Sequence, residues 1–220
     1  MKEIQFVNPL HVKSRRDYLD RVNNFNKGDC AVVAKKFGKE YWDGGRQYGY
    51  GGYSYDGRWH NVATAMADYY QIKAGDRILD VGCGKGFLLY EFTQAVPGVE
   101  VFGLDISEYA VENSKPEVKK QIAVGNAKKL PYESQYFDLV LSNMTLHNLK
   151  IFDLFDSVRE ISRVMKDKAW IGLESYRNEH EKANLLYWQL TCEAFYSPEE
   201  WLWVYQQCEY GGDYEFLCFE

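Results

Sequence analysis

Residues 77–92 read RILDVGCGKGFLLYEF, and this stretch decides the fold class. Residues 77–81 form a short apolar run with β-branched members, which is typical of a buried strand. Three glycines follow at alternate positions, Gly82, Gly84 and Gly86, and an apolar helix is expected to begin directly after them. Glycine allows close approach of a ligand to the backbone, and a helix start offers unpaired N–H groups. The stretch therefore predicts a strand, loop and helix that together bind a polar ligand.

The spacing of these glycines narrows the choice of ligand. A dinucleotide-binding loop reads G-x-G-x-x-G, but this chain has Phe87 where the last glycine of that pattern would stand. A phosphate-binding loop ends in G-K-S/T, but Lys85 is followed here by Gly86. Asp105 ends a second expected strand, and a carboxylate there can accept both hydroxyl groups of an adenosine ribose. The pattern therefore favours an adenosine-containing ligand over a dinucleotide or a bound triphosphate.

These motifs together resemble the class I S-adenosylmethionine-dependent methyltransferases, in their small-molecule group. The resemblance runs from about Asp76 to Leu173, and its motifs stand in the family's order. They are the glycine loop with Asp80, the strand-end Asp105, the stretch GNAKKLPYESQYFDLVLSNMTLHNL, and VREISRVMKDKAWIGLE. The resemblance implies S-adenosyl-L-methionine as the cofactor and S-adenosyl-L-homocysteine as its product. The segment YWDGGRQYGYGGYSYDGRW is also similar to one in a subgroup of bacterial methyltransferases of uncertain substrate.

Strands and helices alternate after residue 60, which predicts an α/β fold with a doubly wound, mostly parallel sheet. Strands are expected over 77–81, 100–104, 121–125, 137–142, 168–174 and 213–219, and helices over 61–70, 86–95, 107–114, 151–165, 179–195 and 198–208. The resemblance implies a Rossmann-like methyltransferase fold, which usually adds a seventh strand in a hairpin. This sequence predicts six strands and an incomplete sheet edge. Because an open edge invites pairing, it would also allow a homodimer.

Residues 1–60 are expected to form a segment of their own ahead of a cofactor-binding core over 61–220. Two short helices are predicted over 14–26 and 29–37. Residues 41–59, which we call the lid, contain six glycines and seven aromatic residues, too many glycines for a helix. Long loops in compact domains are often functional, so we expect the lid to cover the cofactor and line the acceptor pocket, in part with Tyr48, Tyr50 and Tyr55. A surface loop pinned by its rings is the alternative.

Composition excludes several classes of function. The formal net charge is −6 and the basic residues are scattered, so a nucleic-acid substrate is disfavoured. No run of eighteen apolar residues occurs, and the first residues have no apolar signal core, so we expect a cytoplasmic protein with no membrane span. The cysteines are widely spaced and form no metal-ligand pattern, which suits a reducing compartment and implies no metal. They are Cys30, Cys83, Cys192, Cys208 and Cys218.

The resemblance assigns the methionine end of the cofactor to residues near the first and fourth strands. Asp80 would hold the ammonium group, directly or through water, or else cap the helix. Cys83 would pack beside the backbone of the glycine loop, although a helix start can also make a thiol reactive. Ser142 and Asn143 end the fourth strand, where backbone carbonyls would meet the methionine portion. Arg58 would pair with the methionine carboxylate or lie at the surface.

The adenosine end is assigned to the next two strands. Asp105 would bind the ribose hydroxyls, its alternative being a favourable charge at the start of a helix. Ile106 would lie against one face of the adenine. Asn126, followed by Ala127, would bind the adenine edge or serve as a simple turn asparagine.

Methyl transfer from a sulfonium is an in-line displacement in which positioning does much of the work. A hydroxyl acceptor also needs a general base. The first candidate is His147, followed by His60 and Glu174, and His147 and Glu174 could each be structural instead. The sequence predicts transfer to an O or N atom of a small polar metabolite, such as a sugar or a natural-product precursor. The alternatives are a protein or peptide methyltransferase, which should have an open groove, and a non-catalytic cofactor-binding subunit.

Overall fold

The computed structural model describes residues 1–11 and 17–220, and these contain one six-stranded sheet. Its strands are β1 Arg77–Val81, β2 Glu100–Asp105, β3 Ile122–Val124, β4 Leu139–Asn143, β5 Ala169–Ser175 and β6 Asp213–Cys218. The order is β3-β2-β1-β4-β5-β6, and each strand runs parallel to its neighbours. The expected fold class is confirmed, and the sheet is wholly rather than mostly parallel.

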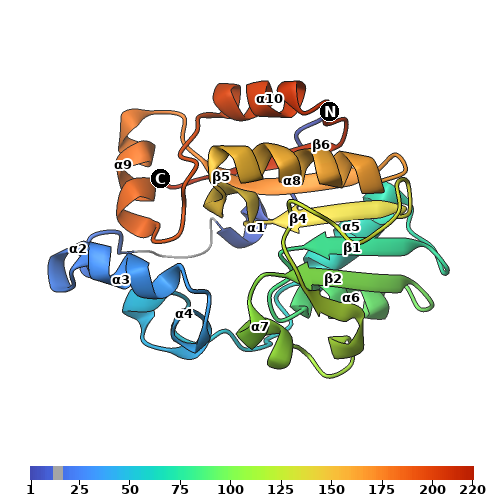
Figure 1. Cartoon of the computed structure of the whole chain (residues 1–220), viewed down its shortest axis with the longest axis horizontal. Coiled ribbons are helices and arrows are strands. Elements are labelled where there is room, and N and C mark those ends of the chain that lie inside the picture. Colours follow the sequence, from blue (N-terminus) through green and yellow to red (C-terminus); the bar gives the residue numbers. More distant parts are fainter. Residues whose placement is uncertain (12–16) are drawn as a thin grey trace.

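Helices cover both faces of the sheet, as the alternating pattern predicts (Figure 1). The helices are α1 Asn8–His11, α2 Asp20–Asn24, α3 Lys27–Ala34, α4 Lys39–Asp43, α5 His60–Tyr70, α6 Phe87–Ala95, α7 Glu108–Glu112, α8 Ile151–Val164, α9 Glu179–Trp188 and α10 Pro198–Gln207. On α8, Leu154, Val158, Ile161 and Val164 recur at helical spacing and are fully buried. They join residues of α10 in one core cluster, whereas α5 and α6 belong to the cluster on the other face.

The first helices form a separate group opposite the carboxyl ends of the strands. Figure 1 shows α2, α3 and α4 at the lower left, facing the strand tips, with α9 above them. Cys30, Ala34 and Leu190 make a small apolar cluster that joins this group to the segment after α9. In parallel α/β sheets, ligands bind outside the carboxyl ends of the strands. The group is therefore placed to close a ligand site from above.

The outer edge of β6 is partly covered by the start of the chain. Ile4 donates its N–H to the carbonyl of Tyr214, and Glu3 and Tyr214 form a parallel bridge. The carboxylate of Glu215 accepts the N–H groups of Phe6, Val7 and Asn8 at 2.8, 2.9 and 2.5 Å. The edge that the sequence predicts to be open is thus less exposed than expected.

The bounds of the expected helices differ most from the structure in two places. The helix expected over 179–195 ends at Trp188, because Gln189 is extended and Glu193 and Ala194 donate their N–H groups to the carbonyl of His147. Of the helix expected over 14–26, residues 14–16 lie outside the described part, and α2 covers only Asp20–Asn24. No helix in the described ranges is long and apolar enough to cross a membrane.

Candidate functional site

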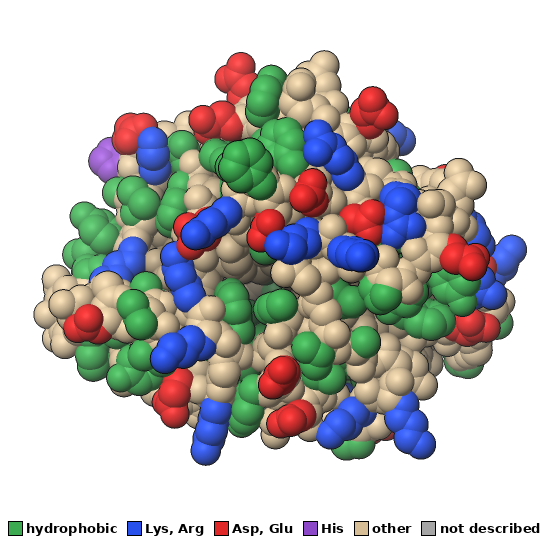
Figure 2. Space-filling view, in the orientation of Figure 1, with side chains coloured by type: hydrophobic (Ala, Val, Ile, Leu, Met, Phe, Trp, Pro, Cys, Tyr) green, Lys and Arg blue, Asp and Glu red, His purple; other side chains and the backbone are tan. Residues whose placement is uncertain are grey.

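A cavity of about 980 Å³ lies between the strand ends and the group of first helices. We call its strand side the floor, made by Asp80, Gly82, Cys83, Gly84 and Asn143. Its opposite side, the roof, is made by the lining residues of segment 17–25, of the lid and of segment 187–191. Figure 2 shows a hollow in this face of the molecule, with Lys and Arg side chains among those that flank it.

The glycine loop leaves no room for side chains. Gly82 and Gly84 have φ angles of +82° and +54°, a region that favours glycine. A Cβ on Gly82 would stand 2.1 Å from Thr145 Oγ1, and one on Gly84 would stand 2.8 Å from the Trp42 ring. The N–H of Gly82 is held by the carbonyl of Leu104 at 2.7 Å, which ties the loop to β2. The loop is therefore fixed by its own backbone and by two neighbouring side chains.

Asp80 is a buried carboxylate that opens onto the floor. Its side chain is 3% exposed, and its Oδ1 has no hydrogen-bond partner in the described structure. Burial, with the nearby charge of Asp105, raises the pKa of Asp80 to about 7. Asn143, at the end of the neighbouring strand β4, also has a buried Oδ1 without a partner. The floor thus presents two acceptor oxygens that a bound cation would satisfy.

Asp105 lies deeper than the sequence suggests. Its carboxylate accepts the N–H groups of Gly84 at 2.7 Å and Ser107 at 2.8 Å, and it is 6% exposed. Trp42 covers the two residues that hold this carboxylate, because its ring lies against Gly84 and its Nε1 donates to Ser107 Oγ at 2.9 Å. Trp42 also stacks on Tyr50, with centroids 5.2 Å apart and ring planes 7° apart. The cavity therefore ends before Asp105.

The residues assigned to the adenine lie on the far side of Asp105, and none of them lines the cavity. Ile106 is 54% exposed, whereas Ala127 is buried. Asn126 Oδ1 accepts the N–H of Lys128 at 3.1 Å, as in a simple turn. Ser142 is fully buried and donates to the carbonyl of Val81 at 3.0 Å, so its side chain joins β1 to β4.

His147 and Glu174, which are far apart in sequence, meet in the cavity wall. His147 Nε2 lies 3.6 Å from Glu174 Oε2, and Gln189 donates to the same carboxylate. Burial lowers the pKa of His147 to about 3, so its imidazole is neutral at pH 7. Its Nδ1 is buried and lacks a partner within the described residues. A neutral imidazole with one unpartnered nitrogen can accept a hydrogen bond from a bound hydroxyl.

The lid contributes only part of its expected residues to the cavity. Tyr50 lines it, and the Tyr50 hydroxyl is hydrogen-bonded to that of Tyr41, which also contacts Thr191. Tyr48 instead packs in the small cluster near Leu190, and Tyr55 donates to the buried carboxylate of Glu91 on α6 at 2.6 Å. Neither lines the cavity.

Arg58 and Cys83 each line the cavity without offering a free reactive group. Arg58 forms a bidentate ion pair with Asp56, with a closest distance of 2.6 Å, and its side chain is 58% exposed. Burial raises the pKa of the Cys83 thiol well above its usual value, so a reactive thiolate is disfavoured and packing is its role here.

Several contacts that shape the site have no local signal in the sequence. Lys85, inside the glycine loop, is buried and pairs with Asp43 of the lid at 2.7 Å. Arg21 and Arg46 both line the roof. The ion pair of Lys85 with Asp43 and the two arginines of the roof bring together segments far apart in the chain, so no single motif could have revealed them.

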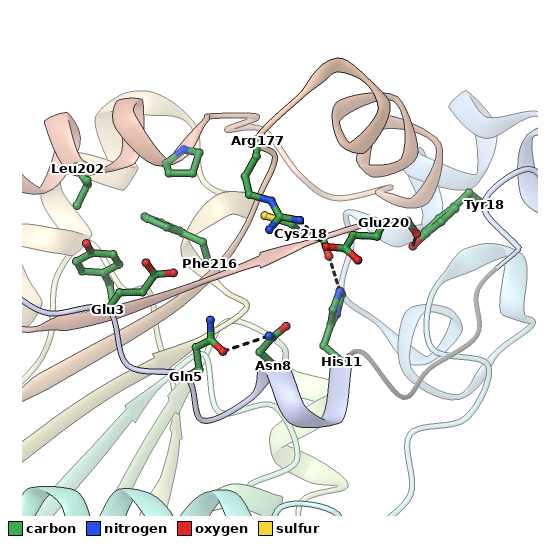
Figure 3. Close-up of a pocket in the computed structure, with 12 residues that line it drawn as sticks. Glu3, Gln5, Asn8, His11, Tyr18, Arg177, Leu202, Phe216, Cys218 and Glu220 are labelled. Atoms are coloured by element: carbon green, nitrogen blue, oxygen red, sulfur yellow. Dashed lines mark hydrogen bonds and ion pairs between the residues drawn. The ribbon is translucent and has the colours of Figure 1, made fainter.

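A second pocket, of about 320 Å³, lies beside the edge of β6 (Figure 3). Its arginine, Arg177, is neutralised by Glu181 at 2.5 Å and by Glu220 at 2.6 Å. His11 Nε2 is hydrogen-bonded to the carbonyl of Cys218 at 2.8 Å. Because its one arginine is already neutralised, this pocket is a weaker candidate than the cavity at the strand ends.

Residues 79–173 match the family model described as a methyltransferase domain. They form a class I S-adenosylmethionine-dependent methyltransferase domain. The match spans β1 to β5 and so contains the floor, His147 and most of the sheet, but not the lid. The methyltransferase domain thus accounts for one side of the cavity only.

Curated relatives and a solved structure agree with this assignment. The chain is 32% identical over 129 residues to 24-methylenesterol C-methyltransferase 3 of Arabidopsis thaliana, covering 52% of this chain and 35% of that protein. It is 32% identical over 117 residues to a demethylmenaquinone methyltransferase of Symbiobacterium thermophilum, covering 50% and 45%. The chain therefore spans less than half the length of these two relatives.

The solved structure is geranyl diphosphate C-methyltransferase from Streptomyces coelicolor, in complex with Mg²⁺, geranyl diphosphate and S-adenosyl-L-homocysteine. It superposes with a TM-score of 0.52 at 17% identity, covering 67% of this chain and 61% of that chain. At this identity the likeness concerns the fold of the methyltransferase domain alone.

Proposed function

We propose that this protein binds S-adenosylmethionine on the floor of the cavity and transfers a methyl group to a small molecule bound beneath the roof. The observation that carries the proposal is the carboxylate of Asp80, which lines the cavity, is buried and has an unpartnered oxygen. A buried polar group without a partner is costly. The ammonium group of the cofactor would satisfy both this oxygen and the Oδ1 of Asn143.

The adenosine end of the cofactor fits once Trp42 has moved. The carboxylate of Asp105 is held by two N–H groups, so it is pre-oriented for ribose hydroxyls at the tip of β2. Trp42 covers the two residues that hold it, Gly84 and Ser107. We therefore propose that the lid opens when the cofactor enters. When bound, the cofactor supplies a methyl group on a positively charged sulfur.

A small acceptor agrees with the shape of the cavity better than a protein does. The roof covers the floor, and about 980 Å³ is at the upper end of the size of small-ligand sites. Part of the wall is polar, which suits a polar metabolite with an O or N acceptor. Its polar residues include Glu174, Gln189, Thr191, Tyr41 and Tyr50. The relative from Arabidopsis and the solved neighbour are named as C-methyltransferases, so a carbon acceptor is the second candidate.

His147 is the residue we propose to position the acceptor and to receive its hydrogen bond at Nδ1. Its pKa of about 3 makes it a weak base at pH 7, so its contribution should be modest. We expect His147→Gln to reduce the rate of methyl transfer by about tenfold, below the range typical of a strong general base. The affinity of the His147→Gln variant for S-adenosylhomocysteine, measured by calorimetry, should differ from that of wild type by less than about threefold. An unchanged transfer rate would remove His147 from the reaction.

The proposed function is tested by calorimetry with S-adenosylhomocysteine, followed by transfer from labelled S-adenosylmethionine to a metabolite extract. Removing one partner of a buried charge pair typically costs about 2–5 kcal/mol. Asp80→Asn should therefore weaken binding at least about thirtyfold. Asp156→Asn is the matched control, because Asp156 is exposed on α8 and lines no part of the cavity.

The two parts of that experiment separate the possible functions. Wild-type protein that binds neither form of the cofactor refutes the proposal. Label in polypeptide instead of a small product would indicate a protein methyltransferase. Tight binding with no transfer to any fraction would indicate a non-catalytic subunit.

A further inference from the structure

Two arginines of the roof lack a carboxylate partner. Five others in the described ranges form ion pairs with Asp or Glu, and these are Arg58, Arg77, Arg159, Arg163 and Arg177. Arg21 and Arg46 form none within the part of the chain that the structure describes, and both line the cavity. The arginines without a counter-ion are therefore gathered at the proposed acceptor site.

The two guanidinium groups share the same surroundings. Both lie over the ring of Trp188, with Cζ atoms 5.7 Å and 5.1 Å from its centroid for Arg21 and Arg46. Arg21 donates to the carbonyls of Trp188 and of Arg46, and Arg46 donates to those of Gly49 and Tyr50 at 2.8 and 2.9 Å. A ring face and carbonyl oxygens orient the guanidinium planes, but they do not neutralise the charges.

The two guanidinium groups thus have no ion-pair partner within the described structure. The Nε of Arg21 is buried and has no partner in the described structure. Burial, followed by the neighbouring charge of Arg46, lowers the pKa of Arg21. Arg21 is half-buried and Arg46 is exposed. Two like charges close together repel each other, and an anion placed between them would remove that repulsion.

The acidic residues nearby do not pair with the two arginines, although the charge of Asp20 acts to raise the pKa of Arg21 against the effect of burial. Asp17 and Asp20 also line the cavity, but both are exposed. Asp17 accepts the N–H groups of Leu19 and Asp20 at 3.0 Å, and Asp20 accepts from Asn24 at 2.8 Å. Neither forms an ion pair with Arg21 or Arg46.

We infer that the methyl acceptor is an anion, and that Arg21 and Arg46 bind its carboxylate or phosphate group at the roof of the cavity. The planar fork of arginine matches both groups, because each offers two oxygens in the spacing of two N–H donors. The anionic end of the acceptor is thereby held away from Asp80, and its reacting atom faces the floor and His147. That the anion is the acceptor rests on the proposed function, whereas the anion site itself rests on the two arginines.

The site is tested without any need for turnover, by titrating inorganic phosphate and, separately, acetate at constant ionic strength. Binding is followed by calorimetry and by the rise in Tm, with and without S-adenosylhomocysteine. Wild-type protein should bind at least one of the two probes, and which one binds more tightly separates a phosphate from a carboxylate acceptor. The Arg21→Gln, Arg46→Gln double variant should lose at least about tenfold in affinity for that probe.

Two further variants separate recognition from a merely structural role. Arg159→Gln, on the exposed surface of α8, should bind the probe within about twofold of wild type. Arg21→Lys with Arg46→Lys keeps the charges but not the fork, so it should lose affinity by an intermediate factor. If wild type binds neither probe, or if the double Gln variant binds as well as wild type, the inference is wrong.

The same measurements distinguish this inference from the proposed function. Phosphate or acetate binding without S-adenosylhomocysteine binding would leave the anion site standing and refute the methyltransferase proposal. Binding of S-adenosylhomocysteine without binding of phosphate or acetate would refute the anion site alone. Where transfer is observed, the labelled product should come from the anion-exchange-retained fraction of the extract, and a labelled product confined to the flow-through would contradict an anionic acceptor.

Discussion

The floor and the roof of the cavity differ in charge and in how the chain builds them. The floor carries the buried carboxylate of Asp80, in a run of consecutive residues that leads from β1 into the glycine loop before α6. The roof carries Arg21 and Arg46, and it assembles from segments 25 and 167 residues apart in the chain. A cationic cofactor and an anionic acceptor would each be attracted to one side and repelled by the other. Opposite charges on two sides of one cavity can therefore orient two ligands relative to each other.

The largest effect should come from filling the backbone of the floor. Gly82→Ala places a Cβ 2.1 Å from Thr145 Oγ1, at a φ of +82° that disfavours any side chain. Strain and overpacking together should cost about 2–5 kcal/mol of the free energy of unfolding. Chemical denaturation measures this cost.

Gly75→Ala is the matched control, because Gly75 has a φ of +85° but no atom lies within 4 Å of the point where its Cβ would stand. It should lose only the strain part, about 1–2 kcal/mol. Equal losses in the two variants would mean that the contact with Thr145 is not tight.

A smaller effect should follow the titration of Asp80. Burial and Asp105 raise its folded pKa to about 7, above the usual aspartate value of 3.8. The folded cofactor-free protein keeps a proton that the unfolded chain has released, so stability falls as pH rises from about 4 through 7. The loss between pH 5 and pH 7 should be about 2 kcal/mol, and Asp80→Asn should remove it.

The same titration controls binding at the floor. Only the ionised carboxylate attracts an ammonium group, so affinity for S-adenosylhomocysteine should drop by up to about tenfold for each pH unit below 7. The Asp80→Asn variant should show no such dependence over this range. A flat affinity profile in wild-type protein would mean that Asp80 does not contact the ammonium group.

The smallest effect should come from loosening the lid. Trp42→Phe removes the indole N–H that bonds Ser107 and should raise the open fraction of the protein. Affinity for S-adenosylhomocysteine should then improve by about threefold, because a closed state lowers apparent affinity. Trp203→Phe, at an exposed position of α10, is the control. Weaker binding in the Trp42 variant would show that the ring packs on the cofactor instead of blocking it.

Much of the fold and of the floor could be predicted from the sequence because their signals are local. Short apolar strands alternate with amphipathic helices, and the glycine loop with Asp80 is one continuous motif. The position of Asp105 at the tip of β2 also follows from its place in the chain. Its burial under Trp42 does not, because the bond from Trp42 to Ser107 joins residues 65 apart.

The roof could not be predicted because its contacts are long-range. The helix expected over 179–195 ends early, at Trp188, since Gln189 turns toward Glu174 and the following residues bond to His147. Arg21, Arg46 and Trp188 stand in no shared motif. Tyr55 was expected near the acceptor from composition alone, yet its hydroxyl donates to Glu91 on α6.

The most direct test of the account is a crossed binding measurement on one set of proteins. S-adenosylhomocysteine and the tighter-binding anion probe are each titrated into wild type, Asp80→Asn, and the Arg21→Gln, Arg46→Gln double variant. Each variant should lose affinity for one ligand by about tenfold or more and change less than about threefold for the other. Loss of both ligands in either variant, with the fold intact, would contradict two oppositely charged sides that bind independently.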